Sequence, residues 1–333
     1  MDSNTTFVEY DPRPYIVALR YVVSIVGVLA NFLVAFVFLY NNIHKKSITR
    51  LLILHQSIID LFGCFFFPVV YNSTIHSDIR GSILCRCRTI FFYFLSASTQ
   101  NLLILTIERY IAVVHPRKYF RNSQSPVKRR IILAIPHVIT FLTGIQLTIF
   151  ADFVAEHPGT CEYSYPVEAI AKWSAGIIFL TFWLIPVVAM SYCYIRILHT
   201  LKERSKNASL PTRENKYGTH RRRDMAERNV ITTLLLIFMA FIITLTPNVV
   251  YYSIHSVCNC LEFETSVIHD ITVLLNALNL TINPFIYAFK FRDFKVGFKV
   301  IVRRIRSRTL FSSSDDVNMT SINHGISITN DNG

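Results

Sequence analysis

Seven apolar stretches, each long enough to cross a lipid bilayer, limit what this chain can fold into. A bilayer core about 30 Å thick needs roughly 20 apolar residues in a helix that rises about 1.5 Å per residue. The stretches that we predict as spans are residues 15–40, 51–71, 86–113, 131–153, 169–198, 229–254 and 266–289. Hydrophobic residues make up 52% of the chain and charged residues 17%, whereas a soluble domain has about 25% charged residues. The sequence therefore predicts an all-α membrane protein.

Basic residues gather on one side of these predicted spans. Most of the 34 Lys and Arg residues lie in the segments that follow spans one, three, five and seven. Since short loops rich in Lys and Arg stay in the cytoplasm, we expect the N-terminus outside the plasma membrane and the C-terminus inside. Asn4 and Asn72, on the predicted outer side, are candidate glycosylation sites. The same distribution explains the net charge of +13 without a nucleic acid as partner.

The spans divide the chain into four predicted parts. These are an extracellular N-terminus (1–14), a seven-helix transmembrane domain (15–289), a short amphipathic eighth helix (290–306) and a disordered cytoplasmic tail (307–333). The eighth helix is predicted because apolar and basic side chains alternate at helical spacing after span seven, as in helices that lie on a membrane surface. The tail is rich in Ser and offers phosphorylation sites.

Asp60 is an acidic residue in the middle of a predicted span. A carboxylate there costs about 2.5–3.5 kcal/mol on insertion scales, so it should face the bundle and find polar partners. The candidates are Asn31, Ser98, Asn279 and Asn283, and the last two share a helix face because they are four residues apart. Such a group could hold Na⁺, or it could be a hydrogen-bonded network without an ion. The residues alone favour neither interpretation.

Glu108 and Arg109 form an adjacent acid and base at the predicted cytoplasmic end of span three, and Tyr110 follows them. Glu227 opens span six on the same side and is a second possible partner for Arg109. An Arg shared between two acids can be released by one of them, which would make a switch. The alternative is that these charges only mark the membrane interface.

The last span contains a proline directly after an asparagine, at Asn283-Pro284. Proline inside a helix removes a backbone donor and costs about 3 kcal/mol. Neighbouring helices, polar side chains and water satisfy the freed carbonyl in a membrane bundle. The pair therefore predicts a bundled helix with a built-in weak point, as a signal-transmitting helix requires.

Taken in order, these motifs resemble the rhodopsin-like (class A) family of G-protein-coupled receptors over roughly residues 15–305. The matching residues are Gly27 and Asn31 in span one, Asp60 in span two, Glu108-Arg109-Tyr110 in span three, Pro186 and Tyr194 in span five, Phe241 and Pro247 in span six, Asn283-Pro284-Phe285-Ile286-Tyr287 in span seven, and Phe294 after it. Each motif is weak alone, and their order makes the resemblance specific.

The resemblance implies a receptor that binds an extracellular ligand and activates a heterotrimeric G protein when helix six moves outward. Arg109 would contact the G protein and Glu227 would restrain Arg109 at rest. Tyr194 and Tyr287 would rearrange to stabilise the open cytoplasmic cleft, and the coupling and switch set would also include Glu108, Tyr110, Asn283 and Pro284. The resemblance further implies a sodium pocket at Asp60, Ser98, Asn279 and Asn283, and a packing switch at Pro186, Thr99, Phe241, Leu245 and Pro247. No cofactor is expected beyond the Na⁺ that Asp60 could hold. A receptor kinase and arrestin are further implied partners, through the Ser-rich tail.

Three positions depart from the family or from particular branches of it. Leu245 stands where the family usually has Trp, Phe91 stands where amine receptors have a ligand-binding Asp, and Ala277 stands where light receptors have the retinal Lys. An amine ligand and a covalent retinal are therefore not expected. The family also links the loop between spans four and five to the top of span three. Here that implies a disulfide from Cys161 to Cys85 or to Cys87, and we favour Cys85.

A peptide is the leading ligand prediction, and a lipid or another small molecule is the alternative. A transporter would show inverted repeats or several central charges, and we find neither in the sequence. The sequence also lacks the HExxH and GxSxG motifs and a Gly-rich phosphate loop, so we do not expect an enzyme.

Overall fold

A computed structural model describes residues 13–75, 78–122, 125–153, 160–207, 217–258 and 266–306. Seven helices in this part of the chain are long and apolar enough to cross a membrane. They are α1 (Pro14–Tyr40), α2 (Ile48–Tyr71), α3 (Ile79–Val114), α5 (Pro126–Phe150), the continuous run of α6 (Glu168–Ile178), η2 (Phe179–Leu184) and α7 (Ile185–Asn207), α8 (Tyr217–Cys258) and α9 (Val267–Lys290). The predicted seven-helix bundle is confirmed. The predicted tail (307–333) and Asn4 lie outside the described residues.

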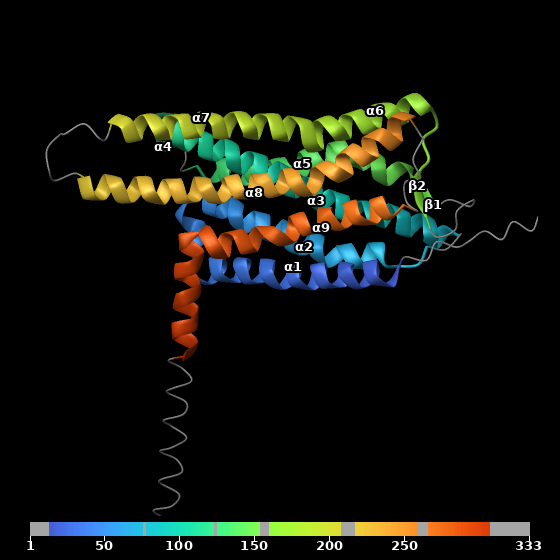
Figure 1. The fold of residues 1–333 in the computed structure, drawn as a ribbon, viewed down its shortest axis with the longest axis horizontal. Coiled ribbons are helices and arrows are strands. Elements are labelled where there is room, and N and C mark those ends of the chain that lie inside the picture. The colour runs from blue at the N-terminus through green and yellow to red at the C-terminus, as the bar shows by residue number, and fades with distance from the viewer. Residues whose placement is uncertain are drawn as a thin grey trace, which may run out of the picture.

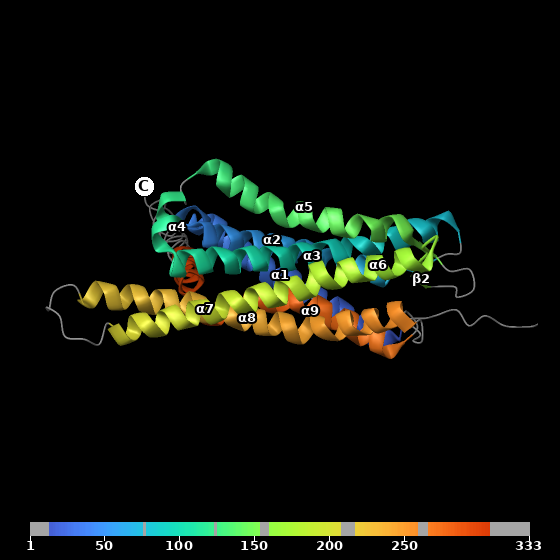
Figure 2. The ribbon, with the colours of Figure 1, turned by 90° about the horizontal axis from the view of Figure 1, so that it is seen from above.

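The helices run side by side along the long axis of the molecule and form one bundle (Figures 1 and 2). Helix α3 packs against α2, α5 and α7, and α1 packs against α2 and α9. A short hairpin of β1 (Ala151–Phe153) and β2 (Cys161–Tyr163) lies at one end, which we call the hairpin end. The short helices η1 (Ile43–Lys46) and α4 (Pro116–Asn122) lie at the opposite end. We call this the Arg109 end.

The fourth predicted span, 131–153, is wrong in its last three residues. Helix α5 ends at Phe150, and β1 pairs antiparallel with β2, so that Asp152 lies opposite Glu162. The backbone donors and acceptors that leave the helix are satisfied by this ladder. The strand is Ala151-Asp152-Phe153, and the pattern of so short a run does not separate a strand from the end of a helix, which explains the error.

A separate helix over residues 292–306 follows α9 and corresponds to the predicted eighth helix. It turns sharply away from the bundle at the Arg109 end (Figure 1, red). Phe291, Phe294 and Ile301 are buried, and the Phe291 ring lies 6.0 Å from that of Phe38 in α1. The apolar side of the predicted amphipathic pattern therefore anchors this helix to the bundle.

Gly27 lets α1 approach two other helices. A Cβ atom there would lie 2.5 Å from Cys64 Sγ in α2 and 2.6 Å from Thr281 Oγ1 in α9, so a larger residue would push the helices apart. One turn further on, Asn31 Nδ2 donates to the carbonyl oxygens of Gly27 and Leu280, at 3.0 Å each. The sequence pair Gly27 and Asn31 thus joins α1 to α9.

Candidate functional site

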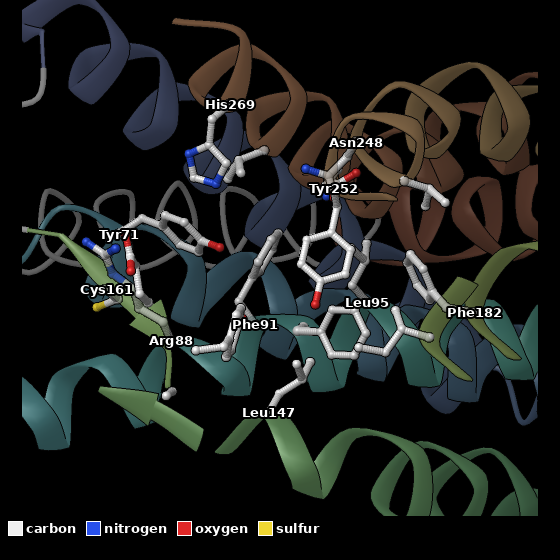
Figure 3. Close-up of a pocket in the computed structure, with 18 of the residues that line it drawn as sticks. Tyr71, Arg88, Phe91, Leu95, Leu147, Cys161, Phe182, Asn248, Tyr252 and His269 are labelled. Carbon is white, nitrogen blue, oxygen red and sulfur yellow. The ribbon is translucent and has the colours of Figure 1, made fainter. Parts of the chain in front are cut away.

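A cavity lies at the hairpin end between α3, α8, α9 and the hairpin (Figure 3). It holds about 910 Å³ of space, counting the part open to solvent. Its walls are mainly apolar, with Phe91, Phe92, Leu95, Leu147, Phe179, Phe182 and Tyr252 among them. Its polar lining includes Arg88, Asn248, His269 and Asn276, and the buried Oδ1 atom of Asn276 has no hydrogen-bond partner among the residues that the structure describes. An apolar cavity with a few placed polar groups is typical of a ligand site.

A disulfide between Cys85 in α3 and Cys161 in β2 fixes the hairpin over this cavity. The Cα atoms of the two residues lie 5.5 Å apart, within the range that a disulfide requires. Cys87 carries a free thiol. The structure therefore has the pairing that the family resemblance implied, and both bonded cysteines line the cavity.

A cluster of charged and aromatic groups stands at the cavity edge. Arg20 in α1 pairs with Asp270 in α9 at 2.6 Å, and both side chains are almost fully buried. The Arg20 and Arg88 guanidinium groups lie 5.5 and 5.3 Å from the centre of the Tyr71 ring. Arg88 Nε also donates to the Val70 carbonyl at 3.2 Å. These contacts tie α1, α2, α3 and α9 together at the mouth of the bundle.

Asp60 lies in the middle of the bundle and is fully buried. Asn283 Nδ2 donates to its Oδ2 at 2.8 Å, and Gln56 Nε2 donates to Oδ1 and Oδ2 at 3.1 and 3.3 Å. Ser98 Oγ accepts from the same Gln56 nitrogen. The structure thus brings three of the four residues of the predicted sodium pocket together and adds Gln56.

Asn279, the fourth residue predicted for that pocket, is placed elsewhere. Its Nδ2 donates to Thr244 Oγ1 in α8 at 2.9 Å. Residues four apart on a helix are offset by roughly 40°, so Asn279 and Asn283 need not reach the same partner. The hydroxyl of Thr244 gives Asn279 a partner on α8, and the place of Asn279 in the sodium pocket stays a prediction.

Glu108 holds Arg109 at the opposite end of the bundle. Arg109 Nε and Nη2 donate to the two Glu108 carboxylate oxygens at 2.7 and 2.9 Å. Thr49 Oγ1 and Tyr119 Oη also donate to this carboxylate, each at 2.7 Å. Burial, together with the nearby Glu108 carboxylate, raises the pKa of Tyr119 to about 12, so its hydroxyl stays protonated and remains a donor. The arginine is therefore held in a closed arrangement.

The cavity, the buried acid and the held arginine lie along one bundle in the order expected of a known receptor family. The family model described as "7 transmembrane receptor (rhodopsin family)" matches residues 30–287. This chain belongs to that family.

Relatives of this receptor include somatostatin receptors. The type 1 receptor of Rattus norvegicus is 27% identical over 309 residues, which cover 90% of this chain and 75% of the relative. The human type 3 receptor is 27% identical over 297 residues, covering 86% of this chain and 68% of the relative. The type 5 receptor of Rattus norvegicus is 27% identical over 287 residues, covering 84% of this chain and 75% of the relative.

The two tyrosines expected to rearrange are both buried and do not bond to each other. Tyr194 shares a hydrogen bond of 3.2 Å with Thr106 Oγ1 and packs its ring 5.4 Å from Phe238. Tyr287 is fully buried after Pro284 in α9, and its hydroxyl has no hydrogen-bond partner among the described residues. An unpartnered buried hydroxyl costs about 1–3 kcal/mol, so Tyr287 would gain from a rearrangement that supplies a partner.

The predicted packing switch lies in the bundle core. Thr99, Phe241 and Leu245 are almost fully buried, and the Thr99 hydroxyl donates to the Leu95 carbonyl at 3.1 Å. Pro247 is inside α8. Pro186 follows the π-helical stretch η2, where Gln100 of α3 donates to the Thr181 carbonyl at 2.8 Å. Tyr110 is half-exposed and packs on the His115 ring at 5.6 Å.

Two further predicted positions are the glycosylation site Asn72 and the proposed restraint Glu227. Asn72 caps α2, its Oδ1 accepts from Arg20 Nη1 at 3.3 Å, and the Nδ2 atom that would carry a glycan is buried. Glycosylation of Asn72 stays a prediction. Glu227 lies in α8, but its side chain is outside the described ones, so its restraint on Arg109 stays a prediction.

The sequence motifs do not predict the roles of Gln56, Tyr119 and the Arg20–Asp270 pair. Gln56 lies four residues before Asp60 on the same helix face, a signal that was available. Arg20 and Asp270 come from opposite ends of the chain, and nothing in their local sequence links them. Tyr119 reaches Glu108 only because α4 folds back after α3.

We expect the Glu108→Gln variant to raise ligand-free signalling roughly fivefold. The amide removes the charge from both bonds to Arg109, and charge-assisted bonds are about twice as strong as neutral ones. A loss of about 1 kcal/mol in the closed state shifts its equilibrium by that factor. Nucleotide exchange on membranes without ligand would measure it, with Tyr119→Phe as a milder variant that removes one bond. An unchanged basal rate would contradict the restraint.

Proposed function

We propose that this receptor binds a peptide at the hairpin end, outside the cell, and activates a heterotrimeric G protein at the Arg109 end. The observation that carries the proposal is that one bundle has a mainly apolar cavity with a few polar groups at one end and a closed acid–base pair at the other. The orientation is supported by the Lys and Arg residues that follow spans one, three, five and seven, since such loops stay in the cytoplasm.

A peptide is favoured because the relatives are receptors named for somatostatin, which is a peptide. The walls of the cavity are mainly apolar and aromatic, which suits the side chain of a peptide, and the hairpin lies beside it. Phe91 lines the cavity wall where amine receptors have an acid, so the ligand differs from an amine in how it is held. Arg88 gives the cavity a cationic group instead.

The signal can pass between the hairpin end and the Arg109 end because the same helices reach both ends of the bundle. Helix α3 carries Arg88 and Phe91 at the cavity and Arg109 at the other end. Helices α8 and α9 line the cavity and are joined by Asn279 and Thr244. A ligand that displaces α8 outward at the Arg109 end would uncover Arg109 for the G protein. Phosphorylation of the tail would then recruit arrestin.

The test is a peptide library applied to cells that express the receptor, with a second-messenger readout. The Arg109→Ala variant is the control, since it should bind a ligand without signalling. Activation by a peptide in the receptor cells and not in the control supports the proposal. Activation by lipid extracts alone would replace the peptide with the lipid alternative.

Once an activating peptide is found, the Phe179→Ala variant should lower its potency roughly 10- to 100-fold. Phe179 lines the cavity from η2, and aromatic anchors in binding sites typically contribute about 2 kcal/mol or more. The matched control is Phe36→Ala in α1, an exposed phenylalanine far from the cavity lining. Equal potency in the two variants would show that the peptide binds elsewhere.

A further inference from the structure

Gln56 places an amide nitrogen between the two groups that a cation at Asp60 would bridge. Gln56 Nε2 lies 3.1 and 3.3 Å from the Asp60 carboxylate oxygens and also donates to Ser98 Oγ. One amide N–H is thus shared by the carboxylate and the other is used by the serine hydroxyl. An ion bonded to the same lone pairs would have to take the space that this nitrogen occupies.

Asn101 in α3 fixes the orientation of the Gln56 amide. Asn101 Nδ2 donates to Gln56 Oε1 at 2.7 Å and to the Leu52 carbonyl at 3.1 Å. Since both Asn101 amide hydrogens are used in this way, its Oδ1 faces His55 Nδ1, at 2.9 Å. His55 Nδ1 therefore carries the proton, and this fixes which way the Asn101 and Gln56 amides point.

The chain of hydrogen bonds continues outward to a third helix. With Nδ1 protonated, neutral His55 accepts at Nε2 from His137 Nε2 of α5, at 3.0 Å. His137 Nδ1 then accepts from the Tyr93 hydroxyl at 2.8 Å. From Tyr93 to Asp60, every bond in this chain donates toward the carboxylate. The inner members Gln56 and Asn101 are buried and the outer ones are half-buried, and a connected network of this kind restricts the orientation of its members.

The residues around Asp60 therefore do not fit a sodium ion. Of the set predicted from the family resemblance, Ser98 is engaged by the Gln56 amide and Asn279 is turned to Thr244. Asn283 offers Asp60 its Nδ2 donor, not an oxygen. A cation needs converging oxygen ligands, and here the carboxylate meets amide N–H groups from two sides.

We propose that Gln56 takes the place of the cation in this receptor, which is consequently insensitive to sodium. The Gln56 amide supplies the positive ends of its N–H dipoles to Asp60 and Ser98, and the Asn101–His55–His137–Tyr93 chain keeps it there. Gln56 is thus the residue that sets the ion specificity of the buried acid, and the chain behind it consists of positioning residues. The native receptor would therefore lack the sodium dependence that the resemblance predicts. Removing the Gln56 amide would allow Asp60 to bind sodium.

Thermal unfolding of the purified full-length receptor in detergent tests this without a known ligand. Unfolding temperatures are compared in NaCl and in choline chloride at the same ionic strength. We expect no sodium-specific shift for the native receptor. The Gln56→Leu variant, which removes the amide, should gain a sodium-specific rise of roughly 3 °C, as expected for an ion at several times its Kd. The double variant Gln56→Leu/Asp60→Asn should lose that rise.

Gln146→Leu is the matched control, because Gln146 is a span glutamine that donates only to the Thr143 carbonyl in the contacts described here. It should show no sodium-specific rise. If Gln56→Leu does not fold, Gln56→Ser removes the same amide and keeps a polar group. A sodium-specific rise in the native receptor that Asp60→Asn abolishes would overturn the proposal. A folded Gln56 variant without any rise would also overturn it, since something else would then exclude the ion.

Discussion

Replacing Arg109 with alanine should abolish G-protein activation while the receptor still reaches the cell surface. Two hydrogen bonds to Glu108 hold Arg109 at the end of α3, and its side chain is about 15% exposed. In the proposed mechanism, the outward movement of α8 exposes this side chain to the G protein. A buried arginine anchor in an interface typically contributes 2 kcal/mol or more. We therefore expect a loss of roughly 100-fold, equivalent to about 2.7 kcal/mol.

The measurement is ligand-stimulated or basal nucleotide exchange, normalised to surface expression. Arg117→Ala is the matched control, because Arg117 is an exposed arginine in α4 close to the same end; it should keep most of the activity. Arg109→Lys keeps the charge but loses the two-pronged geometry, so it should fall between the two. Full exchange by Arg109→Ala at native surface levels would remove this residue from the mechanism.

The spans could be predicted from sequence because the bilayer imposes one strong rule, that about 20 apolar residues must form a helix. The limits of that rule appear at Ala151–Phe153, where the chain leaves α5 and forms a three-residue strand. The same holds at Ile79, where α3 begins well before the predicted span. There Asp78 caps the helix by accepting from the Arg80 and Gly81 amides, so length is set by a cap and not by hydropathy.

The motif residues could be placed on the right helices but not assigned their contacts. Asp60 and Asn283 meet because both face the axis of the bundle. Asn279 does not join them because Thr244 competes for its amide, a contact that depends on how α8 is rotated. The partner of Gln56 could not be predicted because a single amide in an apolar span has many possible partners. Which polar group a buried side chain chooses is decided by helix rotation, which periodicity alone does not fix.

Removing the carboxylate of Asp270 should destabilise the receptor more than any other single change at the hairpin end. In Asp270→Ala, the buried Arg20 would keep its charge without the carboxylate that lies 2.6 Å away. Breaking one side of a buried ion pair costs about 3–5 kcal/mol. In a protein of this size, that corresponds to a fall of roughly 6–20 °C in the unfolding temperature. Thermal unfolding in detergent and the amount of receptor at the cell surface would both report it.

The double variant Arg20→Leu/Asp270→Leu separates the pair from the rest of the network. Replacing both charges with apolar groups removes the uncompensated ion, and such replacements of buried pairs are often close to neutral. Arg20 also donates to the Tyr71 carbonyl at 2.9 Å and to Asn72 Oδ1, and those bonds are lost as well. We therefore expect the double variant to recover most, but not all, of the stability lost in Asp270→Ala. If the double variant is instead as unstable as the single one, the bonds from Arg20 to α2 matter more than its pairing with α9, because only those bonds are missing in the double variant and present in the single one.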